Sequence, residues 1–317
     1  MRFIFDFIII FLILTSAYWI FFLMRSFFYE KEKNKTKISR GILILIIALF
    51  GGAVFYGSFI VPKQLKITEY QIKIGKTVEQ ETIKIALLTD IHAGPYKQNS
   101  FVQKIVTLTT KLNPDLILLG GDLIDSKESE AKFLTPLQSL SEQFPTFAIT
   151  GNHEYHVGLN ETKNYQDKTA KLRLLFEQIN IPFLDNESQK LQIKNNAPFN
   201  LTGVEEFWSP KYDLQKAQSA VDFSLPSLLL SHTPDVLLDP SLGAYDLILA
   251  GHTHGGQIRL PFIGALLGVP TELGRKYEQG EFLINDKKVI ISTGLGETGV
   301  RARLFCPPEI VLITLDL

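Results

Sequence analysis

The sequence has almost no cysteine and almost no net charge. Its single cysteine, Cys306, excludes an intramolecular disulfide and a metal cluster built from thiolates. Its 32 lysines and arginines nearly balance 33 aspartates and glutamates. A formal net charge of −1 provides no electrostatic footprint for nucleic acid, so we expect no nucleic-acid partner. The 317 residues, 45% of them hydrophobic, are enough to bury a sizeable core.

Two long segments near the N-terminus contain no charged residue. They cover residues 7–24 and 41–62, and each is long enough to cross a hydrocarbon core of roughly 30 Å as a helix. A signal peptide is an alternative for the first segment, but the segment is long for one and no small-residue cleavage site follows it. A single span is the other alternative. We predict a membrane anchor at residues 1–62 that contains two transmembrane helices.

The connector between these segments, residues 25–40, is basic. It carries two arginines and four lysines, and short basic loops tend to stay cytoplasmic. This pattern predicts a multi-pass protein of the cell membrane with its remaining residues on the outer side. Four lysines after the second segment, Lys63, Lys66, Lys73 and Lys76, partly offset the bias.

Residues 63–317 are expected to form one α/β domain. Apolar runs typical of buried strands end at Asp90, Asp122 and Asn152, with helical stretches between them. The carboxyl ends of such strands form the edge of the sheet where ligands bind. Further strands are predicted around residues 227–232, 245–252, 280–285, 288–294 and 310–317, and Asn285-Asp286 is typical of a hairpin turn. We predict two packed sheets flanked by helices.

Five of the six histidines lie in short motifs that also carry Asp, Asn or Gly. The motifs are Asp-x-His at 90–92, GGD at 120–122, GNHE at 151–154, SH at 231–232 and GHTH at 251–254. They supply carboxylate, amide and imidazole groups, a donor set that suits Mn²⁺, Fe or Zn²⁺. Taken alone, each piece is more often a turn, a cap or a hydrogen-bonded buried histidine. Their order at successive strand ends favours a metal site.

In this order the motifs resemble those of the calcineurin-like metallophosphoesterase superfamily. The resemblance implies a four-layer αββα sandwich that holds two divalent metal ions, with a metal-bound hydroxide as the nucleophile. Position by position, one metal would be held by Asp90, His92, Asp122 and His254. The other would be held by Asp122, Asn152, His232 and His252, so that Asp122 bridges the two.

Two further residues have candidate roles near the phosphate. His153 matches the histidine of the GNH motif that does not bind metal, and the resemblance implies that it protonates the leaving group; a purely structural role is the alternative. Arg303 follows the glycine-rich segment TGLGETG, where a guanidinium could clamp a phosphate. We assign Arg303 to substrate binding.

Several longer segments resemble one bacterial branch of the superfamily. GDLIDSK lacks the arginine of protein serine/threonine phosphatases, whereas AGHTHGGQIRLP, GVEEFW and the C-terminal segment look like the membrane-associated branch, which includes YkuE- and YaeI-like proteins and transmembrane proteins with a metallophosphoesterase domain. Some relatives hydrolyse the lipid A precursor UDP-2,3-diacylglucosamine. That reaction is cytoplasmic, whereas the connector places this domain outside.

The resemblance leads us to expect cleavage of a phosphodiester or pyrophosphate bond in a phosphorylated small molecule or lipid. The alternative from another class is a catalytically silent membrane scaffold that keeps the fold to bind a partner. Decay of the ligand set would mark such a scaffold, and all seven candidate ligands are present. The sequence carries no signal for an oligomeric state.

Overall fold

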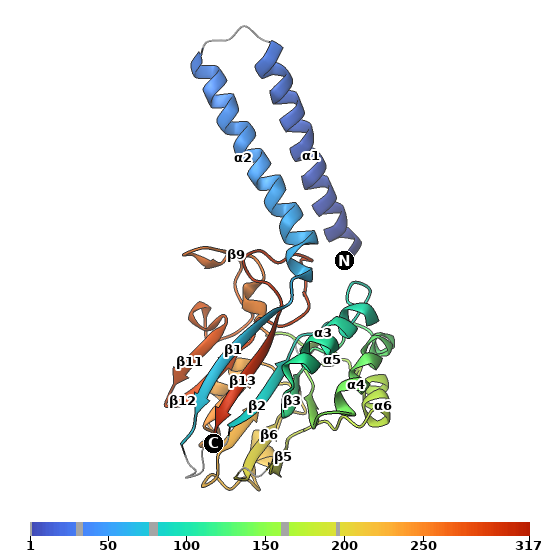
Figure 1. Cartoon of the computed structure of the whole chain (residues 1–317), viewed down its shortest axis with the longest axis vertical. Coiled ribbons are helices and arrows are strands. Elements are labelled where there is room, and N and C mark those ends of the chain that lie inside the picture. Colours follow the sequence, from blue (N-terminus) through green and yellow to red (C-terminus); the bar gives the residue numbers. More distant parts are fainter. Residues whose placement is uncertain (1, 30–33, 76–81, 160–164, 195–196) are drawn as a thin grey trace.

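Two long helices project from one end of a domain built on two β-sheets (Figure 1). The computed structural model describes residues 2–29, 34–75, 82–159, 165–194 and 197–317. Parts of the basic connector (residues 30–33) and Lys76 lie outside the described residues.

The projecting helices are α1 (Arg2–Tyr29) and α2 (Asn34–Phe59). Both are long and apolar enough to cross a membrane. Large apolar side chains along them are exposed, for example Phe7, Phe21 and Leu49, whereas a helix in the core of a soluble protein would bury them. Both helices extend beyond the predicted runs at their charged ends. The second ends earlier as an α-helix, because Pro62 disfavours helical geometry at the residue before it, and the short 3₁₀ turn η1 (Val61–Lys63) follows.

The first sheet has the strand order β1-β13-β2-β3-β4. Strand β2 pairs in parallel with β3, and β3 with β4, while β13 runs antiparallel to β2 and parallel to β1. The bounds are β1 (Lys66–Lys73), β2 (Thr82–Leu88), β3 (Leu116–Gly120), β4 (Thr146–Ile149) and β13 (Glu309–Asp316).

The second sheet has the order β11-β12-β8-β7-β6-β5, with β12, β8, β7 and β6 parallel. Its two outer strands are antiparallel to their neighbours. The bounds are β5 (Glu187–Leu191), β6 (Phe199–Gly203), β7 (Ser227–Leu230), β8 (Leu247–Ala250), β11 (Gly280–Ile284) and β12 (Lys287–Ile291).

The predicted arrangement of two packed sheets is confirmed. A dry core between the sheets contains Leu87, Leu118, Leu230 and Leu249. Helices α3 (Asn99–Leu112) and α6 (Ala170–Gln178), together with η2 (Glu128–Leu137) and α4 (Gln138–Ser141), cover the outer face of the first sheet. The outer face of the second sheet is covered by shorter pieces, α7 (Leu214–Gln218) and η3 (Pro234–Leu238).

The remaining elements are short. Helix α5 (Asn152–Tyr155) follows β4, η4 (His254–Gly256) follows β8, and η5 (Arg275–Tyr277) precedes β11. A small hairpin joins β9 (Arg259–Leu260) to β10 (Gly264–Ala265) and lies beside the domain end of α2 (Figure 1). The predicted turn at Asn285-Asp286 is present, with positive φ angles of 49° and 61° as a tight hairpin turn requires.

Candidate metal centre

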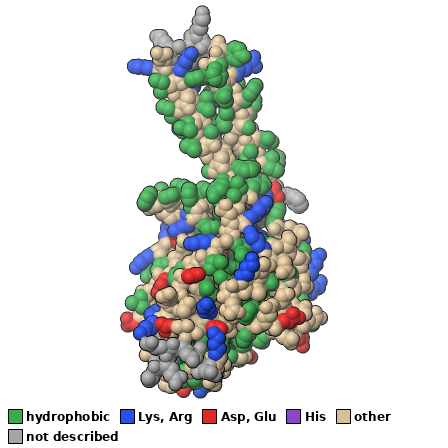
Figure 2. Space-filling model, viewed as in Figure 1, with side chains coloured by type: hydrophobic (Ala, Val, Ile, Leu, Met, Phe, Trp, Pro, Cys, Tyr) green, Lys and Arg blue, Asp and Glu red, His purple; other side chains and the backbone are tan. Residues whose placement is uncertain are grey.

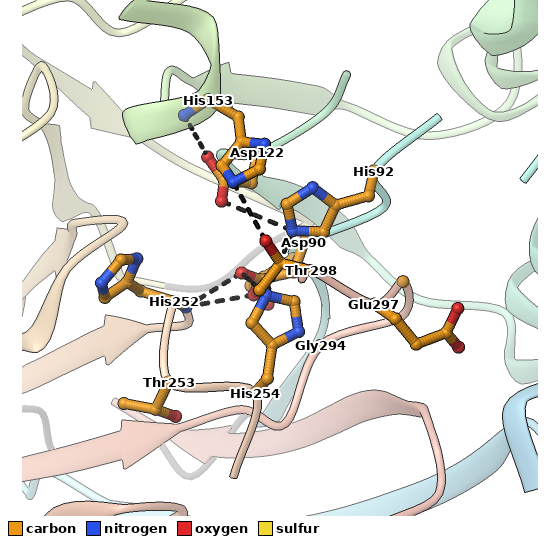
Figure 3. A network of polar contacts seen from close by, with 12 residues as sticks. Asp90, His92, Asp122, His153, His252, Thr253, His254, Gly294, Glu297 and Thr298 are labelled. Atoms are coloured by element: carbon orange, nitrogen blue, oxygen red, sulfur yellow. Dashed lines mark hydrogen bonds and ion pairs between the residues drawn. The ribbon is translucent and has the colours of Figure 1, made fainter. Parts of the chain in front are cut away.

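Five parallel strands from both sheets end at one place. The turns after β2, β3, β4, β7 and β8 carry all seven candidate ligands: Asp90, His92, Asp122, Asn152, His232, His252 and His254. The loops after β2 and β3 run side by side, because the amides of Asp90 and His92 donate to the carbonyls of Gly121 and Asp122 at 3.0 and 2.9 Å. Figure 3 shows the side chains of Asp90, His92, Asp122 and His254 pointing toward one another.

The backbone at this point is strained. Five of the seven residues have a positive φ: 53° at Asp90, 48° at His92, 49° at Asp122, 68° at His252 and 50° at His254. Such a conformation costs a non-glycine residue on the order of 1–3 kcal/mol and clusters at functional sites. The fold therefore holds these residues in a backbone conformation that they would not favour on their own.

The first cluster is Asp90, His92, Asp122 and His254, all buried. Nε2 of His254 lies 3.4 Å from Asp90 Oδ1 and 3.1 Å from Nε2 of His92. Nε2 of His92 lies 3.5 Å from Asp122 Oδ2. One donor atom from each of the four residues falls within 4.8 Å of the others, which is close enough to bind a single ion.

The second cluster is Asp122, His232 and His252, with Asn152 beside it. Nε2 of His232 lies 3.2 Å from Asp122 Oδ2, 3.2 Å from Nδ1 of His252 and 3.3 Å from Asn152 Oδ1. The amide group of Asn152 donates to the carbonyl of Val157, which leaves Oδ1 facing the cluster. The two clusters thus share one oxygen, Oδ2 of Asp122.

Neighbouring backbone fixes the imidazoles of the second cluster. Nδ1 of His232 donates to the carbonyl of Gly120 at 2.8 Å, and Nε2 of His252 donates to the carbonyl of Pro270 at 2.9 Å. Each carbonyl can only accept, so the opposite ring nitrogen carries the lone pair and points into the cluster. This is the arrangement expected for histidines that bind metal.

Glycine is required where these loops approach each other. A Cβ on Gly121, which has φ of 83°, would lie 2.8 Å from Nδ1 of His232. A Cβ on Gly251 would lie 2.4 Å from Oδ2 of Asp90. The glycine that precedes a ligand in GGD and GHTH therefore admits the side chain of another ligand.

The family model of the calcineurin-like phosphoesterase matches residues 83–256, which include every residue of both clusters. The chain belongs to the calcineurin-like phosphoesterase family. It is similar along most of its length to an uncharacterized metallophosphoesterase of Campylobacter jejuni, with 30% identity over 90% of this chain and 73% of that protein. It is also similar to YkuE of Bacillus subtilis, with 28% identity over 84% of this chain and 90% of that protein. The phosphodiesterase YaeI of Escherichia coli is 32% identical over 73% of this chain and 82% of its own length.

The predicted resemblance is thus confirmed, and this phosphoesterase is a metal-dependent hydrolase. Its buried Asp and His cluster suits divalent metal ions. The number of ions and the assignment of each ligand stay predictions, which the two clusters support by their geometry.

Burial keeps three of the histidines at the site neutral. Burial lowers the pKa of His252 to about 3 and holds the pKa values of His92 and His254 well below the usual range. These rings are neutral at neutral pH and keep the lone pair that a metal needs. Burial acts to lower the pKa of His232, but the Asp122 carboxylate outweighs it and raises that pKa well above normal, so a metal must displace a proton from Nε2 of this ring. Burial raises the pKa of Asp90 to about 6.

His153 lies beside both clusters without belonging to either predicted ligand set. Its ring packs against that of His92 with centroids 4.4 Å apart, and its amide donates to Asp122 Oδ1 at 2.8 Å. Nδ1 donates to the carbonyl of Asp125, so Nε2 is the atom that can exchange a proton. Nε2 lies 3.2 Å from the hydroxyl of Thr298, which the sequence analysis did not single out.

Glu154 is a second residue that the sequence analysis left without a role. Its buried carboxylate accepts from the amides of Gly151 at 2.7 Å, Asp122 at 3.0 Å, Leu123 at 2.8 Å and Ile124 at 3.0 Å. It therefore fixes the turn that presents Asp122. Burial and the nearby Asp122 raise its pKa to about 7. Its position as the last residue of the GNHE motif is the feature of the sequence that could have indicated this role.

Arg303 does not lie where a substrate-binding arginine would. Its side chain is completely buried, and its guanidinium donates to the carbonyls of Thr293, Gly294, Gly296 and Cys306. It also lies 3.8 Å from the carboxylate of Glu297. Because its N–H groups already donate to these acceptors, we replace the predicted role in substrate binding with a role in positioning the site. Arg303 holds the glycine-rich segment against Asp90 and lies 3.3 Å from Nδ1 of His254.

Proposed function

We propose that the chain is a two-metal phosphohydrolase that cleaves a phosphodiester or pyrophosphate bond. The observation that supports this most strongly is the division of seven donor side chains into two clusters that share Oδ2 of Asp122. A shared carboxylate oxygen lets two cations lie close together, because its negative charge offsets their repulsion. The two clusters support the predicted ligand sets.

Two cations held in these clusters would neutralise phosphoryl oxygens and lower the pKa of a bound water toward 7. The chain itself supplies orientation and a proton. His153 is oriented by Asp125 and Thr298, and its Nε2 is placed to protonate a leaving oxygen. Trp208 packs edge-on against His252 with centroids 4.7 Å apart and thereby limits the rotation of that ring.

A phosphodiester is the first substrate class to test, because YaeI, a relative of comparable length, is described as a phosphodiesterase. A lipid-linked pyrophosphate of the UDP-2,3-diacylglucosamine type is the second. A phosphoprotein is less suited, since Ser126 replaces the arginine of the protein phosphatases.

We further propose that residues 1–62 are a membrane anchor with two transmembrane helices and that residues 63–317 are the catalytic domain on the outer side. The exposed apolar surfaces of α1 and α2 support two spans. The basic connector at their far end supports the orientation.

The test is a substrate screen with the full chain in detergent. The substrates are a phosphodiester, a phosphomonoester and a nucleotide pyrophosphate, each assayed with Mn²⁺ and with chelator. We expect metal-dependent turnover of the phosphodiester or the pyrophosphate. A chain that binds metal but hydrolyses none of the three would favour the silent scaffold.

A further inference from the structure

A short apolar loop stands out from the surface of the domain. Residues 260–270, LPFIGALLGVP, contain no charged side chain. Within them we define the apolar loop as residues 261–269. Its large side chains are exposed: Phe262 completely, Ile263 by 64%, Leu266 by 50% and Leu267 by 59%. A contiguous exposed apolar patch marks a contact surface rather than ordinary surface variation.

The apolar loop is tied to the domain end of α2. The amide of Arg303 donates to the carbonyl of Gly57 at 2.8 Å, and the next residue, Leu304, pairs with the strand that enters the loop. The amide of Arg259 donates to the carbonyl of Leu304 at 2.9 Å. Three consecutive backbone contacts therefore set the height of the loop relative to α2.

That height corresponds to the edge of a membrane. About 20 residues of helix cover the roughly 30 Å of a hydrocarbon core. Nearly the whole apolar run 41–62 is therefore needed to cross it, and the edge of the core lies close to Pro62. Gly57 is then within roughly 8 Å of that edge at 1.5 Å per residue. The charged end of α1 lies at the same level, because Asp6 forms an ion pair with Arg301 at 2.9 Å.

The surface of the molecule agrees with a membrane edge at the height of the loop. In Figure 2 the apolar side chains of the two helices continue without a break into an apolar protrusion at their base. Lysine and arginine side chains lie on the domain just below it (Figure 2). An apolar edge above a basic zone is the pattern of a surface that inserts among acyl chains and contacts anionic head groups.

The apolar loop also connects directly to the metal centre. It starts a few residues after His254, and a Cβ on Gly256 would lie 2.2 Å from Cβ of Ala265 in the loop. It is followed directly by Pro270, whose carbonyl accepts from His252. The loop is therefore in contact with the GHTH segment near both of its ends.

We propose that residues 261–269 insert into the lipid leaflet that receives the domain ends of α1 and α2. The loop is thus a third segment of the chain in contact with the bilayer, besides the two helices. It holds the metal centre against the head groups of that leaflet. The inference rests on the proposed membrane anchor, but not on the proposed chemistry.

The test measures the depth of single fluorescent labels on the full chain in vesicles that contain phosphatidylcholine and phosphatidylglycerol. A label on Phe262→Cys reports the loop. Leu49→Cys on α2 and Leu174→Cys on α6 are matched controls, since both residues are exposed by 65% and 58%. Cys306 is buried, and the unsubstituted chain checks that it does not react.

We expect lipids with nitroxide-labelled chains to quench the labels at 49 and 262 at least about twofold and the label at 174 hardly at all. Iodide in the water should show the reverse order. If the label at 49 escapes lipid quenching, the membrane anchor fails. If 49 is quenched while 262 behaves like 174, the insertion of the apolar loop is overturned and the anchor stands.

Discussion

Asp122 is the residue that both clusters of candidate ligands share. Its Oδ2 faces His92 at 3.5 Å and His232 at 3.2 Å, one imidazole from each cluster. Replacement of Asp122 by Asn keeps the shape and removes the charge that lets two cations approach each other.

We expect Asp122→Asn to lower metal affinity by more than the roughly 10–100-fold that loss of an outer hydrogen-bond partner costs. Hydrolysis should fall with it. Metal analysis and turnover of the purified variant check this, with Asp115→Asn as a control away from the site. Normal turnover with full metal content would show that Asp122 is not the bridge.

His153 should act on the leaving group rather than on the metals. Its Nε2 faces the site while Nδ1 is occupied by the Asp125 carbonyl. A general acid contributes about 10²–10⁴-fold when the leaving group needs a proton. We expect His153→Gln to slow an alkyl phosphodiester by this factor and a nitrophenyl ester far less, with metal content unchanged.

Equal slowing of both esters would assign His153 to phosphate orientation instead. Loss of metal would make it a structural residue or a ligand. Comparison of the two esters therefore separates three roles for one side chain.

Glu154 should stabilise the turn that carries Asp122. Four amides point at its carboxylate, and the Gln variant would place an amino group among these donors. A buried group left unsatisfied costs about 1–3 kcal/mol. We expect Glu154→Gln to lower both the melting temperature and the metal affinity.

Glu142→Gln is the matched control, since Glu142 is exposed and lies outside the site. A melting temperature and a metal affinity equal to those of the control would show that Glu154 does not position Asp122. Both variants are measured after chelator treatment and again with metal, so that stability and binding are read separately.

At the scale of the element, the helix pair is attached to the domain at one end. Asp6 of α1 contacts Arg301 of the domain, and Gly57 of α2 contacts Arg303. One end of each helix therefore lies at the domain, and the C-terminal end of α1 and the N-terminal end of α2 lie away from it (Figure 1).

We expect a reporter fused within the connector to read cytoplasmic and one fused at Leu317 to read outside, because short basic loops stay inside. Protease or alkylation access in intact cells measures this. The same location for both reporters would refute the two-span anchor and make a cytoplasmic lipid substrate more plausible.

The strands that carry ligands could be predicted because they are buried on both faces. IKIALL, LILLG and FAI read as apolar runs, and each is followed within three residues by a polar residue of the candidate metal centre. Strands β5 and β6 were missed since ESQKL and FNLTG mix polar and apolar residues without a clear period. The predicted helix before β4 is mostly a 3₁₀ segment that contains Pro136.

The role of Arg303 could not be predicted from its sequence context. A glycine-rich segment followed by arginine is typical of a phosphate clamp, but here the segment folds back and its carbonyls surround the guanidinium. That outcome depends on three-dimensional contacts with Asp90 and His254, which lie far away in the sequence. The exposure of the apolar loop likewise depends on how its hairpin packs.

At the scale of the whole molecule, the two sheets come together so that one edge carries every predicted ligand. Strands β2, β3 and β4 contribute from one sheet, and β7 and β8 from the other. Neither sheet alone holds a complete second cluster, since Asp122 comes from the first sheet and His232 and His252 come from the second. The metal centre should therefore stabilise the packing of the two sheets as well as catalyse hydrolysis.

The most direct test of the account is a metal titration of the full chain in detergent after chelator treatment. Mn²⁺ is added while bound metal and hydrolysis of a nitrophenyl phosphodiester are followed together. The account predicts negligible activity without metal and a plateau close to two bound ions per chain, since each cluster takes one. Full activity with bound metal near zero, or a plateau at a single ion, would contradict it.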